Sequence, residues 1–212
     1  GPVSGHAQSA SVPIDSLYAR ADRAAEAGST DAALRLYGDI LQRDSSETQA
    51  LRRRAGLYRE QGEYGTAADE LKRVQQLDDS PPDDIIGNRG WFLIRAGASL
   101  DTARDLSREA MERDPDVFAW PLNLGHTFLL RYQPGSAKIY YRKAINRIHS
   151  DQEYQSALSD FDKFVEQGYN KKRIWGMKDW FRVTYLSEGG GSGGPDPLAF
   201  LGTWITIVVG LV

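Results

Sequence analysis

The fold is decided by the stretch Phe118–Ile145, which reads FAWPLNLGHTFLLRYQPGSAKIYYRKAI. In both halves apolar residues recur at intervals of three and four, the spacing that gives a helix one apolar face. Between the halves lies Gln133–Gly135, a Pro-Gly turn signal. Small residues such as Gly125 and Ala137 stand where two packed helices would have to touch. The stretch therefore predicts two helices paired as a hairpin.

The same pattern of small and aromatic residues recurs earlier in the chain. In the stretch above it comprises Gly125, Phe128, Ala137, Tyr141 and Ala144. These positions resemble the packing positions of the tetratricopeptide repeat, whose period is about 34 residues. Steps of that length lead back to three further starts, at Asp83 or Asp84, at Thr48 and at Ile14. The resemblance implies an all-α fold, an α-solenoid of about four helical hairpins.

Two more helices are expected after the fourth hairpin, over Asp151–Gln167 and Lys171–Leu186. A stack of repeats leaves its last apolar face open, and a terminal cap has to cover it. We expect these capping helices to do so, with the second contributing Ile174, Trp175, Trp180, Phe181 and Tyr185. The two tryptophans could instead form an exposed binding patch.

The composition of the 212 residues is that of an ordinary globular protein. The net charge is -3, with 41% hydrophobic and 26% charged residues, so no basic excess predicts a nucleic-acid partner. Cysteine is absent, which excludes disulfides and thiolate metal sites and leaves the compartment open between cytoplasm and periplasm. We expect the repeat domain to occupy residues 14–188 and residues 1–13 to be the remnant of a removed tag and disordered.

The chain changes character after residue 188. Residues 189–194 read GGGSGG, a composition typical of linkers that join the parts of a fusion protein. Residues 195–212 carry no charge after Asp196, yet as a helix Leu198–Val212 would span only about 22 Å, short of a hydrocarbon core of about 30 Å. We expect residues 195–212 to be a fused hydrophobic partner peptide. Its contacting residues would be Leu198, Leu201, Trp204, Ile205 and Val208.

The family resemblance also implies where a ligand would bind. In such repeats the first helix of each hairpin lines a concave groove, and residues at set offsets from its start meet the ligand. In the first two hairpins these positions include Tyr18, Asp22, Ala25, Arg52, Gly56 and Arg59. In the later two they include Asn88, Trp91, Ile94, Leu122, His126, Leu129 and Leu130, with Asn123 beside them. Leu122 and Leu129 could equally pack between adjacent helices.

The groove positions become more apolar along the chain, which suits an apolar ligand. We therefore expect a protein-interaction module, an adaptor or chaperone that holds a hydrophobic, transmembrane-like segment of a partner. The linker would let residues 195–212 reach the groove of their own chain or of a neighbouring copy, which would form a swapped dimer. The alternative is a scaffold or regulatory subunit of a larger assembly.

No catalytic or metal-binding pattern accompanies the repeats. His126 and His149 belong to different predicted helices and have no partner at metal-ligand spacing. The run Arg52–Arg54 could form a patch for phosphate or an acidic peptide, but we expect a solvated helix face, because three consecutive helical residues point in three directions. The sequence predicts no enzyme, no cofactor and no metal.

Overall fold

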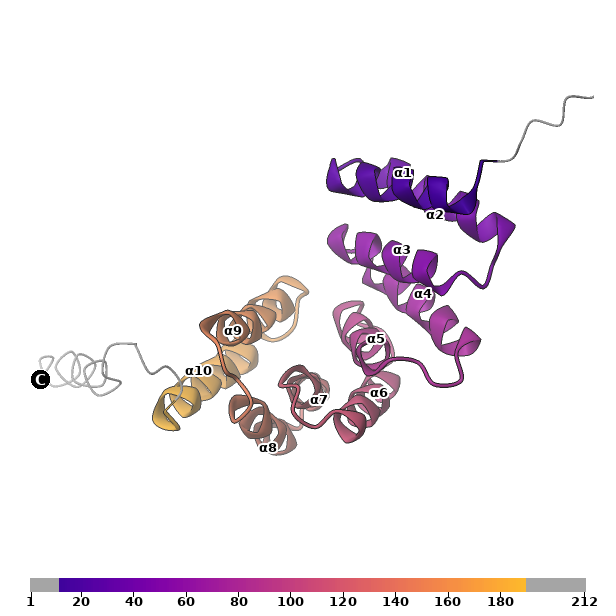
Figure 1. The fold of residues 1–212 in the computed structure, drawn as a ribbon. Helices are drawn as coiled ribbons and strands as arrows, with labels where there is room; N and C mark the ends of the chain where they lie inside the picture. Colours follow the sequence, from indigo (N-terminus) through magenta and orange to yellow (C-terminus); the bar gives the residue numbers. More distant parts are fainter. Residues whose placement is uncertain (1–11, 190–212) are drawn as a thin grey trace, which may run out of the picture. The chain divides into compact units, whose positions relative to one another are not determined.

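A computed structural model describes residues 12–189, and all the secondary structure in this range is helical (Figure 1). Segments 1–11 and 190–212 lie outside the described residues, and with them the expected tag remnant, most of the expected linker and the expected partner peptide. The ten helices of the described part are α1 (Ile14–Glu26), α2 (Thr30–Arg43), α3 (Thr48–Glu60), α4 (Tyr64–Leu77), α5 (Asp83–Arg95), α6 (Leu100–Arg113), α7 (Ala119–Leu130), α8 (Pro134–Ile145), α9 (Asp151–Glu166) and α10 (Lys171–Ser187). The expected all-α fold of helical hairpins is confirmed.

The chain divides into two compact units, Gly1–Ile85 and Ile86–Val212, which we call the first and the second unit. In the first unit α1 pairs with α2 and α3 pairs with α4 (Figure 1). Alanines lie at the helix contacts, since Ala21, Ala33, Ala55 and Ala67 are all fully or almost fully buried. Small side chains at these positions let the paired helices approach closely, and larger apolar residues fill the space on either side.

The turns inside the hairpins depend on glycine. Gly28 and Gly62 follow α1 and α3 and have φ angles of +73° and +80°. Their amides donate to carbonyls of the last helical turn, to Ala25 and Arg59 at 2.9 and 3.0 Å. Only glycine adopts this left-handed conformation without strain. Each glycine therefore ends its helix and lets the chain reverse.

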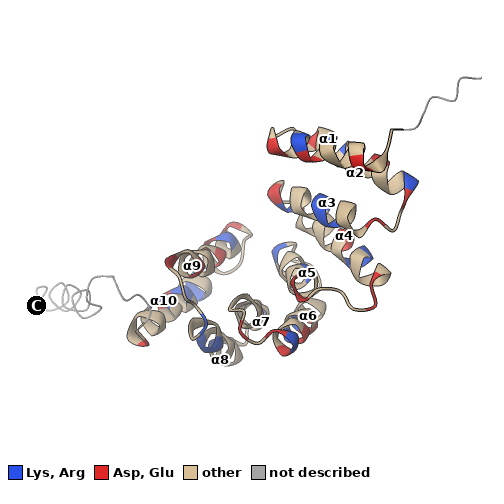
Figure 2. Cartoon of the chain, viewed as in Figure 1, with Lys and Arg blue, Asp and Glu red and all other residues tan. Residues whose placement is uncertain are grey.

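The second unit has its core around α7 and α8. Helix α7 carries no Lys, Arg, Asp or Glu (Figure 2), and most of its residues are buried. The core joins Tyr141 of α8 to Phe161 of α9 and to Phe181 of α10, with ring centroids 5.5 and 5.7 Å apart. Aromatic packing therefore connects α8, α9 and α10, three successive helices of this unit.

Helix α10 fulfils the capping prediction on one face only. Ile174, Phe181 and Tyr185 are buried in the core, and Trp180 packs against it as a partly buried side chain. Trp175 is 44% exposed and takes no part in this cap. Its exposed position agrees with the alternative interpretation, in which Trp175 belongs to an exposed patch.

We predict that Gly125→Ala destabilises the second unit. A Cβ at Gly125 would lie 2.4 Å from ring atoms of Tyr141, whereas a Cβ at Gly38 in α2 would meet no atom within 4 Å. Overpacking of a rigid core costs about 1–3 kcal/mol, so the free energy of unfolding in urea should fall by about that amount. The matched variant Gly38→Ala should gain about 0.5–1 kcal/mol from helix propensity. Equal effects of the two substitutions would contradict this account of the helix contact.

Candidate functional site

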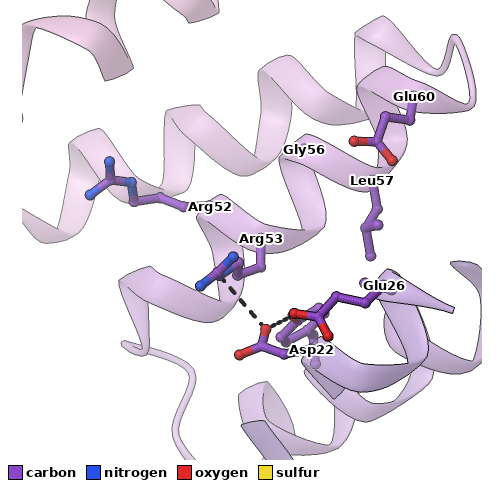
Figure 3. Close-up of a pocket in the computed structure, with 9 residues that line it drawn as sticks. Asp22, Glu26, Arg52, Arg53, Gly56, Leu57 and Glu60 are labelled. Atoms are coloured by element: carbon purple, nitrogen blue, oxygen red, sulfur yellow. Dashed lines mark hydrogen bonds and ion pairs between the residues drawn. The ribbon is translucent and has the colours of Figure 1, made fainter. Parts of the chain in front are cut away.

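The first unit contains an open pocket between α1 and α3 (Figure 3). Its volume is about 380 Å³. The lining residues come from the first helix of each hairpin and from one tyrosine of α2: Asp22, Ala25, Glu26, Tyr37, Arg52, Arg53, Gly56, Leu57 and Glu60. Neighbouring helices thus share one accessible surface, as expected for the ligand-facing helices of such repeats.

Helical spacing explains why these residues meet. Asp22, Ala25 and Glu26 are three and four residues apart on α1, so they lie on one face. On α3 the residues Arg53 and Gly56 have the same relation. The absence of a side chain at Gly56 leaves the middle of the pocket open, because a Cβ there would meet no atom within 4 Å.

The pocket carries both signs of charge. Arg53 Nε lies 3.8 Å from Asp22 Oδ1, and the remaining charged groups on its wall are Arg52, Glu26 and Glu60. The Tyr37 hydroxyl donates a hydrogen bond to Asp22. Burial, together with this bond to Asp22, raises the pKa of Tyr37 well above its ordinary value, so the phenol remains a donor and holds the Asp22 carboxylate in place.

A second hollow adjoins this pocket, since both share Arg52 and Arg53. It has a volume of about 460 Å³ and is also lined by Thr48 and Gln49. Arg52 Nη2 forms an ion pair with Asp84 Oδ2 at 3.3 Å, and both side chains are about half exposed. Exposed pairs of this kind are weak. A ligand carboxylate or amide could therefore replace either partner at little cost.

The structure separates the predicted ligand-contacting residues into two groups. Four of the polar ones lie at or near the surface. Arg52 lines both hollows, Asn88 is exposed, Arg59 pairs with Glu60 at 3.4 Å, and the Tyr18 hydroxyl donates to Glu47 Oε2 at 3.0 Å. Asp22, Ala25 and Gly56, which have the same offsets, line the pocket as well.

The apolar predicted residues are instead mostly buried in the core of the second unit. They are Ile94, Leu122, Leu129 and Leu130, together with the polar Asn123 and His126. Trp91 is partly buried. Leu122 and Leu129 pack between adjacent helices, which is the alternative that the sequence left open for them. A direct role of this set in peptide binding stays a prediction, and ligand contact would require the core to open.

His126 occupies a closed polar position inside that core. Its Nδ1 is 2.9 Å from the Tyr141 hydroxyl, and its Nε2 is 3.5 Å from Asp160 Oδ2. Rings of Phe164, Phe161 and Trp91 surround it, with centroids 4.9, 5.5 and 5.8 Å away. Burial lowers the pKa of His126 and outweighs the opposing effect of Asp160. The imidazole is therefore neutral, with a structural role in this packing.

Sequence reasoning did not assign five residues of the pocket wall to the groove: Glu26, Tyr37, Arg53, Leu57 and Glu60. Glu26 and Glu60 each lie four residues beyond a predicted groove position, Asp22 and Gly56. Extending the groove along each helix by one turn would have found both. Arg53 lies next to the predicted Arg52, and its role depends on its ion pair with Asp22, which the sequence does not reveal.

Two further classes of site are not found within residues 12–189. No group of three or more His, Asp or Glu side chains in that range could hold a metal ion. None of the helices described here has both the length and the apolar character needed to cross a membrane.

We predict that His126 makes the protein less stable in mild acid. In the unfolded chain the imidazole has a pKa of about 6.5, whereas the buried imidazole binds a proton only at lower pH. The unfolded state therefore binds more protons below pH about 6.5, and the free energy of unfolding should fall there, with a slope of at most about 1.4 kcal/mol per pH unit. Urea titrations between pH 5 and 7 measure this slope. His126→Phe should flatten the slope, and an unchanged slope in this variant would contradict the assignment.

Comparison with known proteins supports the repeat architecture. By sequence, no protein family and no curated protein matches the chain. A crystal structure of a MamA protein is similar over 84% of this chain and 92% of its own, with 16% identity and a TM-score of 0.63. A tetratricopeptide repeat protein from Parabacteroides merdae covers 80% of this chain and 71% of its own at 18% identity and a TM-score of 0.51. An O-GlcNAc transferase mutant from Thermobaculum terrenum, at 26% identity and a TM-score of 0.51, covers 63% of this chain and 26% of its own. The chain thus has a fold of the tetratricopeptide-repeat type.

Proposed function

We propose that this protein is a protein-interaction module whose first unit binds a polypeptide segment of a partner in the pocket between α1 and α3. The observation that carries the proposal is the pocket itself. It lies between the first helices of two successive hairpins and its walls carry paired, solvent-accessible charges around an open glycine. This resembles the surface that tetratricopeptide repeats offer to peptide ligands.

The chemistry of the walls favours a polar, extended segment as the ligand. Arg52 and Arg53 can donate hydrogen bonds to backbone carbonyls or carboxylates, and Asp22, Glu26 and Glu60 can accept from amides or basic side chains. The aliphatic floor near Ala25 and Leu57 can receive a small apolar side chain. A segment with charges of both signs would match these groups.

A second candidate function is the holding of a hydrophobic, transmembrane-like segment by an adaptor or chaperone. Its support comes from α10, where Trp175, Val183 and Leu186 are exposed. An apolar segment bound there would remove these side chains from water at about 25 cal/mol per Å² of buried apolar surface before ordering costs. A role as a scaffold of a larger assembly would use folded partner surfaces instead.

We predict that Gly56→Trp weakens peptide binding at the pocket. A tryptophan at this position would project into the open space without displacing packed atoms, so the fold should be retained. Peptides selected from a displayed random library against the full chain serve as ligands, and fluorescence anisotropy measures their Kd. The affinity should fall by about tenfold or more, which corresponds to about 1.4 kcal/mol.

The matched control is Gly38→Trp. Gly38 is also an open helical glycine, and it borders a separate hollow on α2 that includes Arg35 and Gln42. This variant should bind the selected peptides like the parent protein. If all selected peptides bind Gly56→Trp as tightly as the parent, or if both variants lose binding equally, the pocket is not the ligand site.

A further inference from the structure

The outer face of α10 is an apolar surface without a partner in the described part of the chain. Trp175, Val183 and Leu186 are 44%, 59% and 36% exposed. Their spacing of eight and three residues places them on one side of the helix. Residues 12–189 expose seven large hydrophobic side chains, and three of these seven lie on this one helix face.

This face is electrically balanced. The two charged side chains that lie among its apolar residues, Asp179 and Arg182, pair with each other at 3.6 Å. At its beginning the Lys171 ammonium group lies 4.1 Å from the centre of the Trp175 ring and covers part of it. An apolar occupant would therefore meet no uncompensated charge between Trp175 and Leu186.

The opposite face of α10 is fully used. Ile174, Met177, Phe181 and Tyr185 are buried against α8 and α9. Large apolar side chains on the outer face can bind a second neighbour there, because burying them is favourable. The described residues supply neighbours on one side of α10 only.

The chain itself contains a segment of matching length and character. Helix α10 ends at Ser187, and residues 189–194 (GGGSGG) lead to residues 195–212, which carry no charge after Asp196. Six residues of this composition span about 13 Å on average and about 20 Å at most, enough for the chain to reverse beside α10. The exposed face from Trp175 to Leu186 is about 17 Å long, and fifteen helical residues cover about 22 Å.

We propose that residues 195–212 fold back antiparallel to α10 and bind its outer face in the same molecule. In this arrangement position 198 would begin near Ser187, so positions close to 202 would lie beside Val183. Gly210 would lie close to Gly176, where a Cβ would meet no atom within 4 Å and backbones could approach closely. The tether gives an effective concentration on the order of millimolar, which favours this occupant over a separate molecule. The inference rests on the second candidate function, the binding of a hydrophobic segment, and is independent of the pocket in the first unit.

Disulfide pairing in the full chain tests the proposal, since the 212-residue sequence contains no cysteine. Val183→Cys is combined in turn with Gly202→Cys, Thr203→Cys and Thr206→Cys, and the dilute protein is oxidised without detergent. We expect an intramolecular disulfide in at least one pair, seen as faster migration on non-reducing gels and located by mass spectrometry. The matched control is Leu77→Cys with the same three partners, because Leu77 is similarly exposed, at 46%, but belongs to the first unit.

The outcomes separate the proposal from the function on which it rests. A yield of intramolecular disulfide at Val183→Cys at least fivefold above that of the Leu77→Cys control supports both the fold-back of residues 195–212 and the binding of hydrophobic segments by α10. Disulfides at Val183 that join two molecules would retain α10 as a surface for hydrophobic segments and overturn binding within one chain, in favour of a swapped dimer. Pairing at Val183 no greater than at Leu77 would overturn both.

Discussion

The close approach of α7 and α8 at Gly125 is the contact on which the core of the second unit depends. The Tyr141 ring lies directly over the glycine, in space that a Cβ would occupy. From this position the same tyrosine contacts three more rings, those of His126, Phe161 and Phe181, with centroids 5.4 to 5.7 Å apart. Its hydroxyl meets His126 Nδ1. The missing side chain thus allows one aromatic residue to connect α7, α9 and α10.

The fold could be predicted because its determinants are local and periodic. Small residues at fixed spacing, such as Ala33 and Ala137, mark helix contacts, and glycines such as Gly62 mark reversals. These signals depend on backbone geometry and recur along the chain, although Tyr132, with a φ of +65°, takes the place of the glycine between α7 and α8. They do not depend on which helix lies next to which in the folded protein.

The candidate site was predictable only in part, because exposure depends on neighbours. Asp22 and Gly56, which their offsets from the helix starts assign to the groove, line the pocket between α1 and α3. The same offsets selected Leu122 and Leu129, but α7 has no charged residue and packs against α6 and α8, so its groove-facing side is covered too. A helix that is apolar all round has no free face.

The run Arg52–Arg54 of α3 shows that neighbouring residues also determine whether a charged side chain is exposed or buried. Arg52 pairs with Asp84 and Arg53 with Asp22 at the surface, as a solvated face would. Arg54 instead reaches inward, and its Nη2 lies 3.0 Å from Glu70 Oε1, whose side chain is almost completely buried. Burial raises the pKa of Glu70 and the Arg54 charge opposes this shift. Two members of the run remain available to a ligand, while the third belongs to the helix contact.

Helix α10, the last one described, exposes large apolar side chains on the face that points away from the core. A terminal helix in a repeat stack usually presents a polar outer face, since nothing follows to cover it. Here the outer face carries Trp175, Val183 and Leu186, while the inner face already satisfies the capping requirement through Ile174 and Phe181. Because these three side chains face water, they do not contribute to the packing between α9 and α10. In the arrangement that we propose, residues 195–212 cover this surface, so the hydrophobic segment binds at the end of the repeat stack and not at the buried apolar groove positions.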